Sequence, residues 1–152
     1  MNKQEQMLKI LKDTRDHYAE NPKDRRCVDD DGNCNYTWGD NHCAVGRYLR
    51  PEFQRETWTL NNDSVNQLCE EYEDNLCYGI DWVLREEVHG LCPNFWMELQ
   101  DFHDGKRNWV TGEANIWTGP GNKRERGVPG LSDEGKAEYV AIEDKITGGS
   151  YD

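Results

Sequence analysis

Residues 93–109 read PNFWMELQDFHDGKRNW, and this stretch contains the clearest helix in the sequence. Pro93 suits the first turn of a helix, where its missing N–H group would have had no partner. Four large apolar side chains follow at helical spacing and share one face: Phe95, Trp96, Leu99 and Phe102. The stretch therefore predicts an amphipathic helix that buries this face in a core.

Two further helices are indicated, one on each side of this stretch. Residues 3–20 carry apolar and small side chains at helical spacing, namely Met7, Ile10, Leu11, Thr14 and Tyr18. Asn21-Pro22 ends this helix, because the residue before a proline is pushed out of the helical region. Ser132 suits the N-cap of a last helix that ends near Gly148-Gly149.

Shorter elements fill the rest of the chain. Asp31-Gly32 is a common hairpin turn and predicts a small β-hairpin within residues 25–38. Capping residues and apolar spacing predict short helices over residues 43–50 (capped by Asp40 or Asn41), 64–76 (capped by Ser64) and 81–90 (capped by Asp81). Residues 105–130 contain six glycines and two prolines, which predicts an irregular loop.

These patterns predict a mainly α (α+β) fold, a single domain of short helices over residues 1–152 with a small N-terminal β-hairpin. Residues 110–129 are expected to be a loop insertion. The length of 152 residues is typical of one domain, and six Trp, seven Tyr and three Phe can supply a core. The sequence has neither a long apolar run nor a signal peptide, so we expect a cytoplasmic protein that binds no membrane.

Acidic residues are concentrated in the middle of the chain. The net charge is -12, and residues 52–104 carry thirteen Asp/Glu against two Arg. Such a surface repels nucleic acid and attracts a protein with a basic surface. Glu70, Glu73 and Asp74 lie away from the apolar face of the predicted 64–76 helix, and they are the predicted partner-binding residues. The alternative is that these charges only keep the protein soluble.

A second hypothesis is a ligand pocket built from aromatic side chains and an arginine. Arg47, His103 and Trp109 are its candidate residues, because a guanidinium beside aromatic rings suits a small anionic, nucleotide-like ligand.

A third hypothesis is a cysteine- or metal-dependent enzyme. Cys43 would begin a helix, where the helix dipole lowers the pKa of a thiol, and its base would be His17, His89 or His103. The six cysteines lack the close pairs typical of structural zinc sites, and the Asp-rich residues 29–40 match a calcium loop poorly. We therefore expect reduced cysteines, no metal, no cofactor and no catalytic residue.

Four strings of the sequence resemble a loose family of small, uncharacterised proteins from tailed bacteriophages and some bacteria. They are TRDHYAENPKDRRCVDDDGNC (14–34), CAVGRYL (43–49), FWMELQDFHDGKRNW (95–109) and GLSDEGKAEY (130–139). The resemblance covers most of the chain except roughly residues 110–129. It brings no activity, and it implies a phage setting, in which many small acidic proteins inhibit host machinery.

Together these observations lead us to expect a non-enzymatic phage accessory protein in the host cytoplasm. It would bind and inhibit a host protein with a basic surface, as an acidic nucleic-acid mimic or an anti-defence factor.

Overall fold

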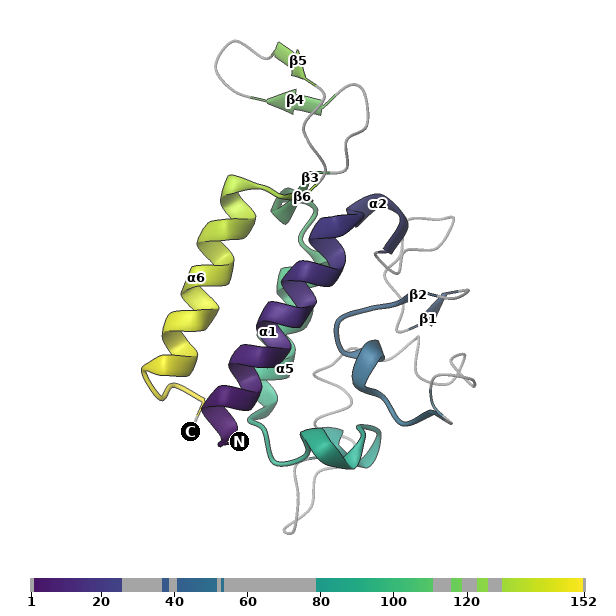
Figure 1. Ribbon diagram of the computed structural model, residues 1–152, viewed down its shortest axis with the longest axis vertical. Helices are drawn as coiled ribbons and strands as arrows, with labels where there is room; N and C mark the ends of the chain where they lie inside the picture. Colours follow the sequence, from purple (N-terminus) through teal and green to yellow (C-terminus); the bar gives the residue numbers. More distant parts are fainter. Residues whose placement is uncertain are drawn as a thin grey trace.

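The computed structural model describes residues 2–25, 37–38, 41–51, 53, 79–110, 116–118, 123–125 and 130–151. Three long helices lie side by side in it: α1 (Lys3–Glu20), α5 (Pro93–Asp104) and α6 (Asp133–Thr147) (Figure 1). Each of these helices contacts the other two. The expected mainly helical fold is therefore confirmed for the described residues.

Helix α1 begins with a reciprocal cap between Asn2 and Glu5. The Asn2 side chain accepts a hydrogen bond from the main-chain N–H of Glu5 (2.8 Å), and the Glu5 carboxylate accepts one from the main-chain N–H of Asn2. This capping box satisfies N–H groups that the start of a helix leaves free. As predicted, α1 ends before Pro22, which begins the short helix α2 (Pro22–Arg25).

The apolar face predicted for α5 forms the centre of the core. Phe95, Trp96, Leu99 and Phe102 have no exposed surface. They share one cluster with buried side chains of α1 and α6, including Leu11, Tyr139 and Ile142. Helix α6 also begins as predicted, because Ser132 Oγ accepts a hydrogen bond from the main-chain N–H of Gly135 (3.0 Å).

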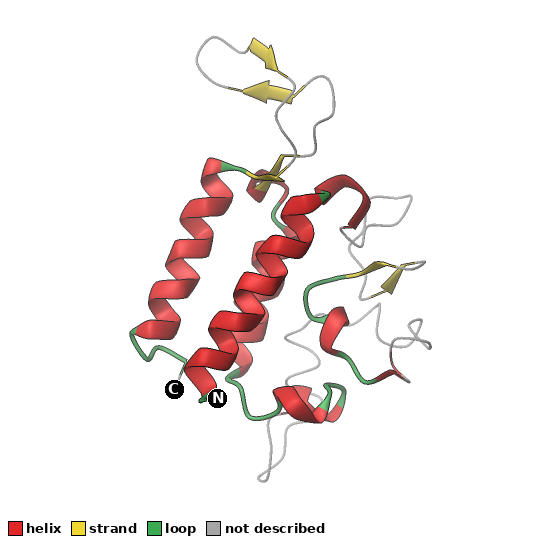
Figure 2. Cartoon of the chain, in the orientation of Figure 1, coloured by secondary structure: helices red, strands yellow, loops and turns green. Residues whose placement is uncertain are grey.

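Among the described residues, six short strands, the yellow arrows of Figure 2, form three antiparallel pairs. They are β1 (Thr37–Trp38) with β2 (Asn41–His42), β3 (Trp109–Val110) with β6 (Gly130–Leu131), and β4 (Ile116–Thr118) with β5 (Lys123–Glu125). The hairpin turn expected at Asp31-Gly32 lies outside the described residues, the β1–β2 pair follows it at residues 37–42, and the other described strands lie within residues 109–131. The expected N-terminal hairpin is therefore not confirmed.

The segment expected to be an irregular loop contains regular structure. Strands β3 and β6 pair Trp109 with Leu131 and so bring the two ends of residues 111–129 together. The described residues between them form the β4–β5 pair, which lies beyond the end of the helix bundle (Figure 1). That residues 110–129 are an insertion into a single domain stays a prediction.

Two predicted helices are wrong. Residues 43–50 contain only the 3₁₀ turn η1 (Gly46–Tyr48), and residues 81–90 contain parts of η2 (Gly79–Trp82) and η3 (Glu86–Val88). Asp81 does not cap a helix there, because its carboxylate accepts from the main-chain N–H of Gly90 (3.0 Å). A fourth turn, η4 (Lys106–Asn108), follows α5. The helix predicted over residues 64–76 lies outside the described residues.

Candidate functional site

The predicted partner-binding residues are not placed by the structure. Glu70, Glu73 and Asp74 all lie outside the described residues. Their role in binding a partner therefore stays a prediction.

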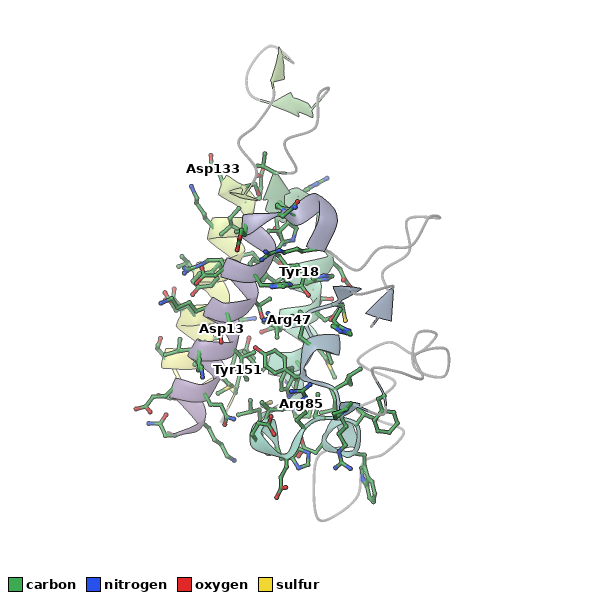
Figure 3. The ribbon with its side chains drawn as sticks, turned by 45° about the vertical axis from the view of Figure 1, so that its right-hand side comes forward. Asp13, Tyr18, Arg47, Arg85, Asp133 and Tyr151 are labelled. Atoms are coloured by element: carbon green, nitrogen blue, oxygen red, sulfur yellow. The ribbon has the colours of Figure 1, made fainter. Side chains whose placement is uncertain are left out.

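Two of the three residues of the predicted ligand pocket, His103 and Trp109, are buried. His103 has no exposed surface and Trp109 is 5% exposed. Both rings pack against Tyr18, with centroids 4.5 Å and 6.0 Å from that of Tyr18, and Trp109 Nε1 donates to the main-chain oxygen of His103 (3.0 Å). The structure brings His103 and Trp109 together as core residues. Arg47 is half-buried and donates from Nη1 to the main-chain oxygen of Asp13 (3.4 Å) (both are labelled in Figure 3).

His103 pairs with the carboxylate of the next residue, Asp104. Its Nδ1 donates to Asp104 Oδ1 (2.7 Å), and Gln100 Nε2 donates to the same oxygen (2.8 Å). Gln100 Oε1 in turn accepts from the main-chain N–H of Val45 (3.2 Å). The His103–Asp104 pair thus belongs to a network that connects α5 to the turn at residues 43–48.

Cys43 lies in a different environment from the one predicted. It is 1% exposed, it does not begin an α-helix, and its Sγ accepts from the main-chain N–H of Gly46 (3.2 Å). Of the six cysteines, the structure describes Cys43 and Cys92, and both are free thiols.

A cleft of about 450 Å³ lies between α5 and the C-terminal end of α6. We call it the α5–α6 cleft. The residues that line it are Asn94, Met97, Glu98, Asp101, Lys145, Ser150 and Tyr151. Asn94, Glu98 and Asp101 share one face of α5, because they are three or four positions apart along the helix. Asn94 and Glu98 are each two positions from Trp96, so this face lies opposite Trp96.

Carboxylates of both helices act electrostatically on Asp101, which lines this cleft. Partial desolvation raises the pKa of Asp101, and the negative charges of Asp104, Glu138 and Glu98 raise it further. Glu138 belongs to α6 and the others to α5. We call these four residues the acidic cluster. The three neighbouring negative charges therefore add to desolvation in disfavouring the charged form of Asp101.

Lys145 is the one basic side chain among the described residues that line the α5–α6 cleft. Its Nζ forms an ion pair with Glu98 Oε1. The other carboxylate oxygen of Glu98 and the hydroxyl of Tyr151 are buried, and neither has a hydrogen-bond partner in the described structure. A buried polar atom without a partner costs about 1–3 kcal/mol. Two polar atoms of residues that line the cleft are therefore unsatisfied within the described structure.

The acidic cluster does not have the geometry of a metal site. Nowhere in the described ranges do three His, Cys, Asp or Glu side chains come close enough to hold one metal ion. Carboxylates that are spread along two helices suit larger cations. The ammonium of lysine and the guanidinium of arginine are examples, because each donates several hydrogen bonds in different directions.

The sequence did not predict this site, although it contains the pattern of the α5 residues that line it. The spacing of Asn94, Glu98 and Asp101 shows that they point away from the apolar face of α5. The sequence could not show that Glu138 and Tyr151, about 40 to 50 residues further on, complete the same surface.

Among the described residues, no helix combines the length and the apolar character needed to cross a membrane. No family model, curated protein or solved structure matches the chain.

Proposed function

We propose that this protein is a non-enzymatic phage accessory protein that binds and inhibits a host protein with a basic surface. The acidic cluster at the α5–α6 cleft supplies one part of the contact surface in this proposal. Glu70, Glu73 and Asp74 supply another part. The basic surface of the partner would normally hold nucleic acid, so the protein would act as a mimic or an anti-defence factor in the host cytoplasm.

One observation carries the proposal, namely that Glu98 and Asp101 line the α5–α6 cleft, where desolvation and then the charges of three neighbouring carboxylates raise the pKa of Asp101. A surface that serves only solubility mixes charges of both signs, so that few like charges repel one another. Here Lys145 pairs with Glu98, and the structure describes no ion pair of Asp101 or Glu138. A cation on a partner would relieve the repulsion among these carboxylates, which favours association.

The phage setting rests on the sequence resemblance and not on the fold. The strings CAVGRYL (43–49) and GLSDEGKAEY (130–139) belong to that resemblance. Many small acidic phage proteins inhibit host machinery. In such a protein, a dense acidic surface would serve to bind the host protein.

Charge reversal at Asp101 tests the proposal. The tagged parent protein, D101K and D144K would be used for affinity capture from bacterial lysate at low salt and at about 0.5 M salt, where screening acts within a few ångströms. Asp144 is an exposed residue of α6 outside the α5–α6 cleft, so D144K makes the same change in net charge elsewhere.

We expect one partner to be captured by the parent and by D144K at low salt, and to be lost with D101K and at high salt. The partner would be identified by mass spectrometry and the binding repeated with purified proteins. A triple variant at Glu70, Glu73 and Asp74 shows whether that segment contributes as well. If D101K and the triple variant both bind as tightly as the parent, the acidic residues serve solubility and the proposal is wrong.

A further inference from the structure

Two arginines occupy equivalent places on either side of an antiparallel pair. Leu49 and Leu84 form an isolated β-bridge, and the next residues, Arg50 and Arg85, each donate their main-chain N–H across it (2.9 Å). Their side chains also donate hydrogen bonds across the bridge. Arg50 Nε donates to the main-chain oxygen of Leu84 (3.0 Å), and Arg85 Nε donates to that of Leu49 (3.0 Å).

This arrangement holds both guanidinium groups by their Nε atoms. His89 Nε2 donates a hydrogen bond to the main-chain oxygen of Leu84 (2.8 Å), the same oxygen that accepts from Arg50 Nε. The two Nη atoms of Arg50 have no hydrogen-bond partner in the part of the chain that the structure describes. A guanidinium that is fixed in this way loses little entropy when it binds a ligand.

The fixed side chains border a cleft of about 680 Å³, which we call the arginine cleft. Its volume lies in the range of small-molecule sites, about 300–1,000 Å³. The residues that line it are Arg50, Pro51, Arg85, Glu86, Glu87 and His89. Arg85 lies in the loop that precedes α5 (Figure 3).

We propose that the arginine cleft binds a small molecule that carries a phosphate and several hydroxyl groups, such as a sugar phosphate. The free edge of the Arg50 guanidinium can donate two parallel hydrogen bonds to phosphate oxygens. Glu86 and Glu87 are exposed at the same cleft, and carboxylates accept hydrogen bonds from hydroxyl groups. The cleft thus offers donors for the phosphate and acceptors for the rest of the ligand.

The same charges exclude an extended polyanion as the ligand. The chain has a net charge of -12, and Glu86 and Glu87 lie next to the arginines. A nucleic acid would bring many phosphates against this negative surface, whereas a small ligand places one phosphate beside Arg50. This inference does not depend on the proposed partner-binding function, which concerns residues outside the arginine cleft.

Isothermal titration calorimetry with ribose 5-phosphate, ribose, gluconate and inorganic phosphate tests the inference on the full-length protein. We expect ribose 5-phosphate to bind more tightly than inorganic phosphate, which lacks the hydroxyl groups, and ribose not to bind. Gluconate has a carboxylate in place of the phosphate, so tighter binding of gluconate would overturn the assignment to phosphate ligands. Binding of ribose that equals that of ribose 5-phosphate would overturn the role of the arginines.

Two variants of Arg50 and a matched control complete the test. R50Q removes the charge, and R50K keeps the charge but cannot make two parallel hydrogen bonds. We expect both to weaken ribose 5-phosphate binding by about 10- to 100-fold, the range for a charge-assisted hydrogen bond. Arg107 is exposed in η4 at the other end of α5, so R107Q should bind as the parent does.

R50K also guards against loss of the fold, because Lys can still donate to the main-chain oxygen of Leu84. Circular dichroism and the unfolding midpoint would be recorded for each variant. If R50K is folded and binds ribose 5-phosphate as tightly as the parent, or if R107Q weakens binding as much as R50K does, the inference is wrong.

Discussion

A Cβ atom on Gly135 would lie 2.3 Å from the main-chain oxygen of Asn108. The first turn of α6 therefore touches the backbone of η4, and Ser132 reinforces the contact by donating its main-chain N–H to the same oxygen (2.9 Å). We expect G135A to lower the free energy of unfolding by about 1–3 kcal/mol, the usual cost of overpacking. Helix propensity alone predicts a gain of about 1 kcal/mol.

Denaturant unfolding of G135A and of K136A distinguishes these two effects. Lys136 is the next residue and is exposed, so K136A should change the free energy of unfolding by no more than about 0.5 kcal/mol. A G135A protein that is more stable than the parent would show that α6 does not pack closely against η4.

Leu99 is the central residue of the buried face of α5 and has no exposed surface. We expect L99A to lower the free energy of unfolding by about 2–5 kcal/mol, because it removes apolar contacts and leaves a cavity. Val140 is 49% exposed on α6, so V140A is a matched control with an expected change within about 0.5 kcal/mol. Equal effects of the two substitutions in denaturant unfolding would contradict the placement of Leu99 in the core.

The three long helices could be predicted because their signals are local. Asn21-Pro22 ends α1, Pro93 begins α5 and Ser132 caps α6, and each segment repeats apolar residues at helical spacing over several turns. Local signals of this kind depend on neighbours within about four residues. They survive in the fold because tertiary packing favours the same helices.

The segments at 43–50 and 81–90 could not be predicted in the same way. Each looked like a short helix, but the Leu49–Leu84 pairing and the hydrogen bond from Gly90 to Asp81 hold them as turns. Those contacts join residues that are up to 35 positions apart, and a short helix has too few internal hydrogen bonds to compete with them.

The burial of two candidate site residues could not be predicted from the sequence for a related reason. Burial of His103 and Trp109 follows from packing against Tyr18 on α1, which no pattern within residues 95–109 reveals. Residue type suggested the chemistry of these side chains, but only the tertiary structure decides which of them reach solvent.

Asp81 links the two ends of the segment 81–90 that precedes α5, through a hydrogen bond to Gly90. It is 3% exposed, and its Oδ2 accepts from the main-chain N–H of Gly90, a residue with a φ of 82°. We expect D81A to lower the free energy of unfolding by about 1–3 kcal/mol, because the partly buried N–H of Gly90 loses its partner. D81N keeps an acceptor at this position and should cost less than D81A. Equal losses for the two variants in denaturant unfolding would show that the hydrogen bond to Gly90 is unimportant.

His17 should contribute to the change in the free energy of unfolding with pH. Burial, followed by the charges of Arg47 and Arg25, lowers the pKa of His17 from 6.5 to about 4. Between these two values the unfolded chain binds a proton that the folded protein does not, so the free energy of unfolding decreases as the pH falls from 6.5 to 4. Because His17 is partly exposed, we expect its share of this loss to be about 1–3 kcal/mol. H17Q should lose less stability than the parent between pH 7 and pH 4.5 in denaturant unfolding, and R47Q should raise the pKa of His17 in an NMR titration. A His17 that titrates near 6.5 in the folded parent, or an H17Q protein with the same pH dependence as the parent, would contradict this account.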